Sequence, residues 1–425
     1  MTQTKTVIGA EPTIAGVSGF KAAGVHCGYK KDGALDFALI YSEKPCIAAG
    51  VFTRNVVKAA PVLLDMERLA ANTTHIRAVV INTRCANACT GEQGLENART
   101  MARWTAERLG IAEDEVLVMS TGVIGTQLDM DKIRRGVDLS VAALADGAAA
   151  WENAAHAIMT TDTRAKLASA RGGADYTVAG IAKGAGMIAP NMATMLGIVV
   201  TDAALEPEWA VGTLRAVNET TFNRIVVDGD TSTNDTLLLL ANGHETDAAG
   251  FEEALRPVCK QLAQAIVRDG EGATKFITLN ISGAGDDATA RLIGNTIATS
   301  PLVKTAFYGG DANWGRIVAA AGRAGVPLVD TALKLWLAPG EDVPLDANAL
   351  LLFEHGMPTT YSETRATEIM ASPSVTVWLD CGIQSAGEDA LPATDVTTHP
   401  QAGAATIWTC DLSHDYVSVN GHYRT

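Results

Sequence analysis

The chain has 425 residues, which is enough for two or three domains of ordinary size. Acidic residues outnumber basic residues 48 to 33, and the net charge of −15 disfavours binding to nucleic acids and to anionic membrane surfaces. A hydrophobic content of 47% excludes a disordered chain, and because only 5% of the residues are aromatic, small aliphatic side chains must fill the core.

The first residues and the cysteines favour a cytoplasmic protein. The chain start lacks a basic segment followed by an apolar one, so we expect no signal peptide. The longest mostly apolar stretch, Met187–Val200, contains Pro190 and is too short to cross a bilayer. Seven scattered cysteines, an odd number, are expected to be reduced thiols. Cys85 and Cys89 have no other Cys or His close by, so we expect two buried small side chains rather than zinc ligands.

Short apolar segments bounded by Gly, Asn or Asp predict strands along much of the chain. In order, these strands are Asp36–Tyr41, Ile76–Ile81, Val116–Met119, Tyr176–Ala182, Leu196–Val200, Arg224–Val227, Thr236–Leu240 and Phe276–Ile281. Helical spacing of apolar residues predicts helices at Glu92–Leu109, Met130–Ala149, Pro207–Thr221, Phe251–Arg268 and about Ala288–Thr299. Because strands outnumber helices and do not alternate with them regularly, we expect sheets covered by helices rather than a doubly wound parallel sheet.

The most unusual segment runs from Lys183 to Gly197 and reads Lys-Gly-Ala-Gly-Met-Ile-Ala-Pro-Asn-Met-Ala-Thr-Met-Leu-Gly. Its first two glycines permit close approach of the backbone, and Pro190 fixes the chain shortly before Thr194, which opens an apolar strand. Read alone, the segment is an ordinary Gly/Pro turn before a core strand. It is not a dinucleotide-binding fingerprint, because the third glycine and the strand–turn–helix context are missing.

Other polar segments lie between apolar strands, and we interpret them together with the Lys183–Gly197 segment. The string Val118–Gly125 follows a strand and can aim a hydroxyl and a backbone N–H into a pocket. The further segments are Phe52–Pro61, Ala88–Gly94, Asp228–Thr236, Gly270–Phe276 and Phe307–Arg316. In this order and spacing, from about Gly16 to Thr425, the strings together resemble the ornithine acetyltransferase family, also called glutamate N-acetyltransferase, of the cyclic arginine pathway. The segment Asn82–Asn87 departs from the family's Asn-Ser-Gly-Asn-Ala-Asn, so we expect different local contacts there.

The resemblance implies an enzyme that cuts itself. In the family, the precursor is cleaved between the Ala and the Thr of the Met-Ala-Thr-Met-Leu-Gly string, here Ala193 and Thr194, and the new N-terminal Thr becomes the nucleophile. The Thr-Gly pair that follows a strand, here Thr121 and Gly122, forms the oxyanion hole. The family's substrate-binding residues correspond to Thr160, Lys183, Thr194, Glu271, Asn420 and Thr425.

The fold that the resemblance implies is of the α/β (α+β) class, with two sheets packed between helix layers in an α/β/β/α sandwich. The cut would give an alpha chain, Met1–Ala193, and a beta chain, Thr194–Thr425, which share one core, and two such pairs would form a heterotetramer. The implied reaction moves acetyl from N2-acetyl-L-ornithine to L-glutamate by a ping-pong route, with no cofactor or metal. Family members differ in whether they also accept acetyl-CoA as a donor.

The chemistry of these residue types supports the assignment independently. A threonine hydroxyl is a poor nucleophile and needs a base beside it. Cleavage supplies that base, because the freed α-amino group of Thr194 has a reference pKa of about 7.7–8.0. Attack on the acetyl carbonyl develops negative charge, which donors from Thr121 and Gly122 would stabilise. Acetylornithine carries a carboxylate and an ammonium group, so we assign Lys183 to the carboxylate and Glu271 to the ammonium.

Other motifs are interpreted as structural. The segment Asp228–Asp235 begins like a calcium loop, but it lacks the glycine at the sixth position and has Leu239 where the bidentate Glu should be, so we expect Asx turns. Adjacent side chains cannot form a catalytic triad, so Ser413–Asp415 is expected to be a polar turn. Trp314 and Arg316 are expected to pack or to pair structurally.

Two alternative functions remain open. An N-terminal-nucleophile aminopeptidase of similar fold would hydrolyse its acyl-enzyme with water, whereas an acetyltransferase would release ornithine only when glutamate is present. A non-catalytic metabolite-binding protein would remain uncut and would bind acetylornithine without turnover.

Overall fold

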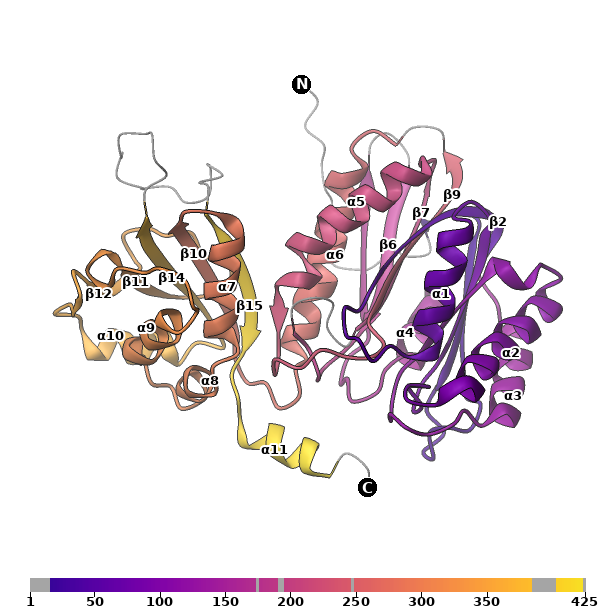
Figure 1. Cartoon of the computed structure of the whole chain (residues 1–425), viewed down its shortest axis with the longest axis horizontal. Coiled ribbons are helices and arrows are strands. Elements are labelled where there is room, and N and C mark those ends of the chain that lie inside the picture. The colour runs from indigo at the N-terminus through magenta and orange to yellow at the C-terminus, as the bar shows by residue number, and fades with distance from the viewer. Residues whose placement is uncertain (1–15, 173–175, 190–194, 246–247, 384–402, 423–425) are drawn as a thin grey trace. The chain divides into compact units, whose positions relative to one another are not determined.

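The computed structural model describes residues 16–172, 176–189, 195–245, 248–383 and 403–422. The chain forms two compact units (Figure 1), one consisting of Met1–Asn223 with Asp230–Asp269 and the other of Arg224–Gly229 with Gly270–Thr425. Each unit has its own sheet and its own hydrophobic core.

The sheet of the first unit is built around one long strand, β2 (Phe37–Phe52). Its first half pairs with β1 (Phe20–Val25) and β3 (Ile76–Asn82), and its second half pairs with β9 (Thr236–Glu245). The remaining strands are β4 (Val116–Ser120), β5 (Lys166–Gly172), β6 (Tyr176–Lys183) and β7 (Leu196–Ala203). The order is β4-β3-β2-β9-β7-β6-β5, with β1 beside β2.

The two halves of this sheet share one core. Ile40 of β2 and Val79 of β3 belong to the same buried cluster as Ile198 of β7 and Leu238 of β9. Helices α2 (Gly91–Leu109) and α3 (Met130–Ala142) cover the β2–β4 half, and α5 (Pro207–Thr220) and α6 (Phe251–Arg268) pack on the opposite side against β2, β5 and β6 (Figure 1). These layers form an α/β/β/α sandwich, which confirms the predicted fold class.

Local signals explain where these helices begin and end. In α2, the buried residues Met101 and Thr105 recur at helical spacing, and the helix ends at Gly110, whose φ of 70° is left-handed. Helix α5 begins at Pro207, where a missing N–H costs nothing. The predicted helices at 92–109, 207–221 and 251–268 are therefore confirmed, as are the predicted strands that became β2, β3, β4, β6, β7 and β9.

The single helix predicted for Met130–Ala149 is wrong. The chain forms α3 up to Ala142 and starts again as α4 (Ala148–Ala157). Between the two helices, Ala145 exchanges both backbone hydrogen bonds with Ala22 of β1, at 2.8 and 3.1 Å. Gly147 then caps α4 in an extended conformation. Tertiary pairing with the sheet edge therefore overrides the helical pattern of the sequence.

The second unit has a mixed sheet in the order β13-β12-β11-β14-β10-β15-β8. Its strands are β8 (Ile225–Val226), β10 (Phe276–Ala284), β11 (Lys334–Pro339), β12 (Leu350–Glu354), β13 (Met357–Pro358), β14 (Ser374–Ile383) and β15 (Ala405–Cys410). Alternate residues such as Ile277, Leu335 and Val377 form one core with its helices, which are α7 (Asp287–Ala298), α8 (Pro301–Tyr308), α9 (Trp314–Gly322) and α10 (Glu363–Met370). The strand predicted at Arg224–Val227 is shorter, because a 3₁₀ turn occupies Phe222–Arg224.

Two further expectations concern the state of the cysteines and the presence of membrane-spanning helices. All seven cysteines are free thiols in the structure. Cys85 is buried as predicted, but Cys89 is exposed, because its backbone turns with a φ of 56° just before α2. Among the described residues, every helix is too short or too polar to pass through a lipid bilayer.

Candidate active site

Two predicted site residues, Thr121 and Lys183, lie close together at the ends of two strands of the first unit. Thr121 follows β4 and Lys183 ends β6. The Lys183 Nζ donates a hydrogen bond to the Thr121 Oγ1 at 3.3 Å, and both residues are buried, with 3% and 4% of their surface exposed. Because the Thr121 oxygen accepts this bond, its hydroxyl proton can point elsewhere and donate to a ligand.

The turn at Thr121 and Gly122 is fixed by a second loop. The Thr121 N–H donates to the Asn82 carbonyl at 3.1 Å, and the Val123 N–H donates to the Arg84 carbonyl at 3.2 Å. Gly122 has a φ of 135°, and a Cβ atom there would lie 2.2 Å from the Arg84 carbonyl carbon, so only glycine fits. Arg84 itself has a φ of 70°, at the position where the family pattern has glycine. Arg84 therefore adopts a left-handed backbone conformation that glycine adopts more easily.

A buried carboxylate joins the neighbouring turn to Lys183. The Oδ1 of Asp162 accepts from the Gly184 N–H at 2.6 Å and from the Lys166 Nζ at 2.7 Å, and its Oδ2 accepts from the Thr160 N–H at 3.0 Å. Burial raises the pKa of the Asp162 carboxyl, but the charges of Lys183 and Lys166 and these hydrogen bonds outweigh burial, and the net pKa lies well below its usual range. The structure therefore brings Thr160 beside Lys183 and Gly184.

Asp162 is part of a buried network that no sequence motif predicts. Lys166 also contacts the Asp269 Oδ2 at 2.6 Å, and Asp269 accepts from the Thr163 N–H at 3.0 Å. The three charged side chains are at most 4% exposed. The network thus fixes the position of the turn that carries Thr160. The only signal in the sequence is that Asp162 follows Thr160 in the Met-Thr-Thr-Asp string.

The loop between Asp228 and β9 also supports the site. The Asn234 side chain donates to the carbonyls of Ala86 and Ser120 at 2.6 and 2.8 Å, so it joins the two loops that flank Thr121. Asp235 Oδ1 accepts from the Met195 N–H at 3.1 Å. The Asn234 N–H donates to the Ser232 Oγ at 3.1 Å, so in this part of the loop a serine, not an Asp or Asn, accepts the turn hydrogen bond. Among the described residues, no cluster of His, Cys, Asp or Glu is suited to hold a metal. Ala193 and Thr194 lie outside the described residues.

The remaining predicted binding residues belong to the second unit. The Asn420 side chain donates to the Glu271 Oε2 at 2.8 Å, from α11 (His414–Gly421). Thr425 lies outside the described residues. Ser413 is not part of a simple turn, because its Oγ accepts from the backbone N–H groups of Asp415 and Tyr416 at 3.2 and 3.4 Å and thereby caps α11.

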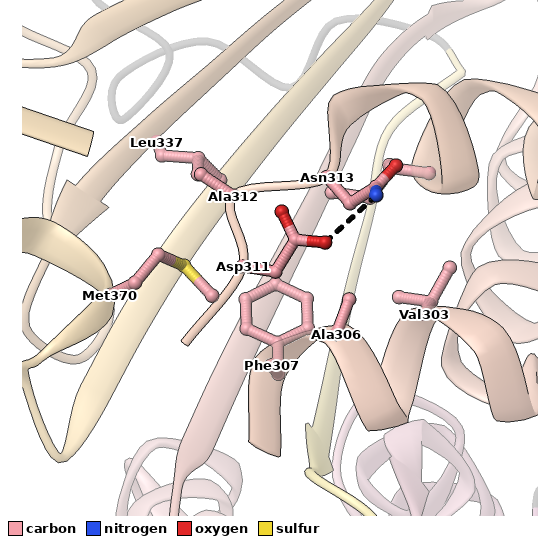
Figure 2. Close-up of a pocket in the computed structure, with 9 residues that line it drawn as sticks. Val303, Ala306, Phe307, Asp311, Ala312, Asn313, Leu337 and Met370 are labelled. Atoms are coloured by element: carbon pink, nitrogen blue, oxygen red, sulfur yellow. Dashed lines mark hydrogen bonds between the residues drawn. The ribbon is translucent and has the colours of Figure 1, made fainter. Parts of the chain in front are cut away.

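The segment Phe307–Arg316 has a structural role. Asn313 caps α9 by accepting from the Arg316 N–H at 3.1 Å, and Trp314 stacks on Phe353 with ring centroids 5.3 Å apart. Figure 2 shows a small pocket beside this segment, where the Asp311 carboxylate accepts from the Asn313 amide at 2.9 Å. Its empty space of about 190 Å³ is lined mostly by apolar side chains and contains none of the predicted site residues. Because none of the predicted site residues lines it, we do not assign the active site to this pocket.

Comparison with known proteins covers almost the whole chain. A model described as the ArgJ family matches residues 21–425. The arginine biosynthesis bifunctional protein ArgJ of Geobacter sulfurreducens is 47% identical over 421 residues, which cover 96% of this chain and 100% of that protein. The protein of the same name from Thermotoga neapolitana is 45% identical over 421 residues, covering 96% and 99%. The crystal structure of ornithine acetyltransferase from Mycobacterium tuberculosis complexed with ornithine is 43% identical, covers 44% of this chain and 96% of that chain, and has a TM-score of 0.41.

Proposed function

The chain belongs to the ArgJ family, and we infer that it is an acetyltransferase of arginine biosynthesis that moves acetyl from N2-acetyl-L-ornithine to L-glutamate. The observation that carries the mechanism is the buried contact between Lys183 and Thr121, which puts a cation and a hydroxyl donor at one point in the first unit. The two substrates are small molecules, and no cofactor or metal takes part in the proposed reaction.

The first step is proposed to be cleavage of the chain itself. The Thr194 hydroxyl attacks the Ala193 carbonyl, the peptide C–N bond breaks, and water hydrolyses the resulting ester, which leaves a carboxylate on Ala193 and an amino group on Thr194. The products would be Met1–Ala193 and Thr194–Thr425. Strand β6 precedes this point and its neighbour β7 follows it, so both products would contribute to one sheet.

In the transfer reaction, the Thr194 hydroxyl attacks the acetyl carbonyl of acetylornithine and its proton passes to the α-amino group. The oxygen of the tetrahedral intermediate receives hydrogen bonds from the Thr121 hydroxyl and the Gly122 N–H. Removal of one such donor typically raises the activation free energy by about 2.7–4 kcal/mol. The proton then moves to the departing ornithine nitrogen, and the amine of glutamate takes the acetyl group in the reverse sequence. In the same way, acetyl-CoA would serve as an additional donor if its thioester reached Thr194.

Substrate binding is assigned to Thr160, Lys183, Thr194, Glu271, Asn420 and Thr425. We assign Lys183 to a substrate carboxylate. Its burial and its closeness to the Asp162 carboxylate, whose pKa its charge lowers, support this assignment. Glu271, which already accepts a hydrogen bond from Asn420, would hold the ornithine ammonium. We further propose that two alpha and two beta chains assemble as a heterotetramer in the cytoplasm.

One assay distinguishes an acetyltransferase from a hydrolase. With acetylornithine as donor, ornithine release should depend on added glutamate, and acetylglutamate should appear in equal amount. Release at the same rate in water alone would indicate an aminopeptidase-like enzyme. Acetylglutamate formed from acetyl-CoA and glutamate in a parallel reaction would establish the second donor.

Glu271→Gln is expected to raise the KM for acetylornithine by about tenfold or more, because a charge-assisted hydrogen bond contributes about 1.5–3 kcal/mol. Cleavage of the chain should be unaffected, since maturation involves no ornithine. The measurement is steady-state transfer kinetics on the purified variant. Glu368→Gln is the control, because Glu368 is an exposed partner of Arg365 in the same unit and should leave the kinetics unchanged. A wild-type KM in Glu271→Gln would contradict the assignment of the ammonium contact.

A further inference from the structure

One buried carboxyl group binds the loop that carries Glu271 to a distant segment of the second unit. Asp411 is 3% exposed and follows Thr274 by 137 residues. Its Oδ1 accepts from the backbone N–H groups of Thr274 and Lys275 at 2.8 and 2.9 Å, and its Oδ2 accepts from the Thr274 hydroxyl. Asp411 therefore fixes the orientation of two consecutive peptide groups of the loop.

A second contact holds the same loop at Gly272, the residue after Glu271. The hydroxyl of Ser413, which is also buried, donates to the Gly272 carbonyl at 2.6 Å. Gly272 has a φ of 69°, and a Cβ atom there would lie 2.5 Å from the Tyr416 nitrogen. The loop therefore approaches the start of α11 so closely that only glycine fits.

The third contact is to the Glu271 side chain itself. The Asn420 amide donates to the Glu271 Oε2 at 2.8 Å and to the Tyr416 carbonyl of α11 at 3.1 Å. One carboxylate oxygen of Glu271 is thus held, while the other can accept from a ligand. A carboxylate held in this way loses little conformational freedom when a ligand binds, so more of the interaction energy contributes to affinity.

Strand pairing explains why segments so far apart in the sequence meet. Strands β10 and β15 are antiparallel neighbours, and Phe276 at the start of β10 lies opposite Cys410 at the end of β15. Residues 270–275 lead into β10 and Asp411 follows β15, so both lie at the same end of this strand pair. The sheet brings the loop and Asp411 together, and the side-chain contacts then fix the position of the loop.

A buried lysine that the proposed reaction does not use holds the Asp411 segment in place. Lys304, in α8, is 3% exposed, and its Nζ donates to the Thr409 Oγ1 at 3.0 Å and to the Cys410 carbonyl. Its own carbonyl accepts from the Leu412 N–H at 3.3 Å. Residues on both sides of Asp411 are therefore bound to α8, so the segment that supports the loop is itself supported by a helix.

We propose, on the premise that Glu271 holds the ammonium group of acetylornithine, that Asp411 and Ser413 are positioning residues that make the enzyme specific for donors with a cationic side chain. They act through Glu271 and need no contact with the substrate. Because they fix the loop on both sides of its turn, the Glu271 carboxylate is preorganised for the ammonium group. Loss of these contacts lowers the preference for a cationic donor without changing how the acetyl group is transferred.

The first test compares two donors that differ only in the ammonium group. N2-Acetyl-L-norvaline has the carbon chain of N2-acetyl-L-ornithine without the terminal amine, so the ratio of the two kcat/KM values measures the ammonium contact. The assay is formation of acetylglutamate with glutamate as the acceptor. The wild-type enzyme should prefer acetylornithine by about tenfold or more, and Glu271→Gln should remove most of this preference.

Asp411→Ala removes all three hydrogen bonds from Asp411 to the loop and should also remove most of the preference. It should change kcat/KM for acetylnorvaline by less than about twofold, whereas a merely structural role would lower kcat/KM for both donors by the same factor. Asp411→Asn keeps the Oδ1 acceptor and should stay within about threefold of the wild-type preference. The double variant Glu271→Gln/Asp411→Ala should be as selective as Glu271→Gln, because the two residues act through one contact.

Asp287→Ala is the matched control. Its Oδ1 accepts from the backbone N–H groups of Gly403 and Ala404 at 3.1 and 3.0 Å, at the opposite end of β10 and β15. Its loss should leave the donor preference unchanged. Ser413→Ala is the second variant, which leaves no charged group unpaired and should lower the preference by about threefold or more.

A wild-type preference in the folded Asp411→Ala enzyme would overturn the proposal, as would an equal loss of activity toward both donors or an equal loss of preference in Asp287→Ala. If Asp411→Ala does not fold, Ser413→Ala decides the question by the same criteria. These failures leave the proposed function intact. A wild-type preference in Glu271→Gln would instead overturn the ammonium contact, and a wild-type enzyme that transfers no acetyl from acetylornithine would overturn the proposed function.

Discussion

Replacing Thr194 by alanine is expected to give a folded, full-length and inactive chain. In the proposed mechanism the same hydroxyl attacks the Ala193 carbonyl during maturation and the acetyl carbonyl during transfer, so its loss removes both reactions. Loss of one hydroxyl and one methyl changes little of the apolar burial, so the fold should survive. Denaturing electrophoresis and the acetylornithine–glutamate assay measure the two effects on the same sample.

Thr194→Ser is the informative companion. Serine keeps the hydroxyl but loses the methyl that restricts χ1, so cleavage should be retained, although slowed, and transfer should fall because attack geometry is less well fixed. A Thr194→Ala chain that is cut normally and transfers acetyl would show that both the nucleophile and the mechanism are wrong.

Asp162→Ala is expected to lower the free energy of unfolding of the first unit by about 3–5 kcal/mol and to abolish most of the activity. It removes the carboxylate that binds Lys166 and accepts from the Gly184 and Thr160 N–H groups. Of the two buried lysines, Lys166 keeps Asp269 as a partner, whereas Lys183 loses the nearby Asp162 charge, so one positive charge loses its compensation. The measurement is urea unfolding in the uncut Thr194→Ala background, where unfolding involves a single chain.

The sign of the pH dependence follows from the lowered pKa of Asp162 in the folded chain. The carboxylate contributes stability above the unfolded-state value of about 3.9, and this stability is lost as the pH falls toward the lower folded value. The difference between Asp162→Ala and its parent should therefore shrink in acid. Arg108→Ala is the control, because its ion pair with Asp138 is exposed and should contribute only about 0–1 kcal/mol. If Asp162→Ala lowered the free energy of unfolding by only about 0–1 kcal/mol, the stabilising role of the Asp162, Lys166 and Asp269 network would be contradicted.

Much of the first unit could be predicted because its elements carry local signals. Buried strands such as β3 and β7 each contain an apolar run, Ala78–Ile81 and Leu196–Val200, and α2 has both a periodic buried face and a glycine stop. The break between α3 and α4 could not be predicted, since it arises from pairing of Ala145 with β1. The strands of the second unit beyond β10 were also missed, although β11 alternates buried and half-buried residues and β12 begins with an apolar run.

The candidate site residues are indicated by sequence motifs, whereas the residues that support them in the structure are not. Thr121, Lys183 and Thr160 lie in recognisable strings, and the structure brings these three together. Asp162, Asp235 and Asn234 act through hydrogen bonds to backbone groups far away in the chain, and no spacing rule relates an asparagine to the carbonyls of Ala86 and Ser120. Such contacts depend on the folded path of the loops, which local sequence does not specify.

Intact-mass spectrometry of the purified wild-type protein, with and without acetylornithine, tests the central claim most directly. Residues 1–193 of a 44.4 kDa chain of 425 residues correspond to about 20 kDa, and the remainder to about 24 kDa. We predict these two pieces, with the larger one beginning at Thr194, gaining one acetyl group from acetylornithine and losing it when glutamate is added. A single full-length chain in an active preparation, or acetyl on the smaller piece, would contradict an acyl-enzyme formed on Thr194.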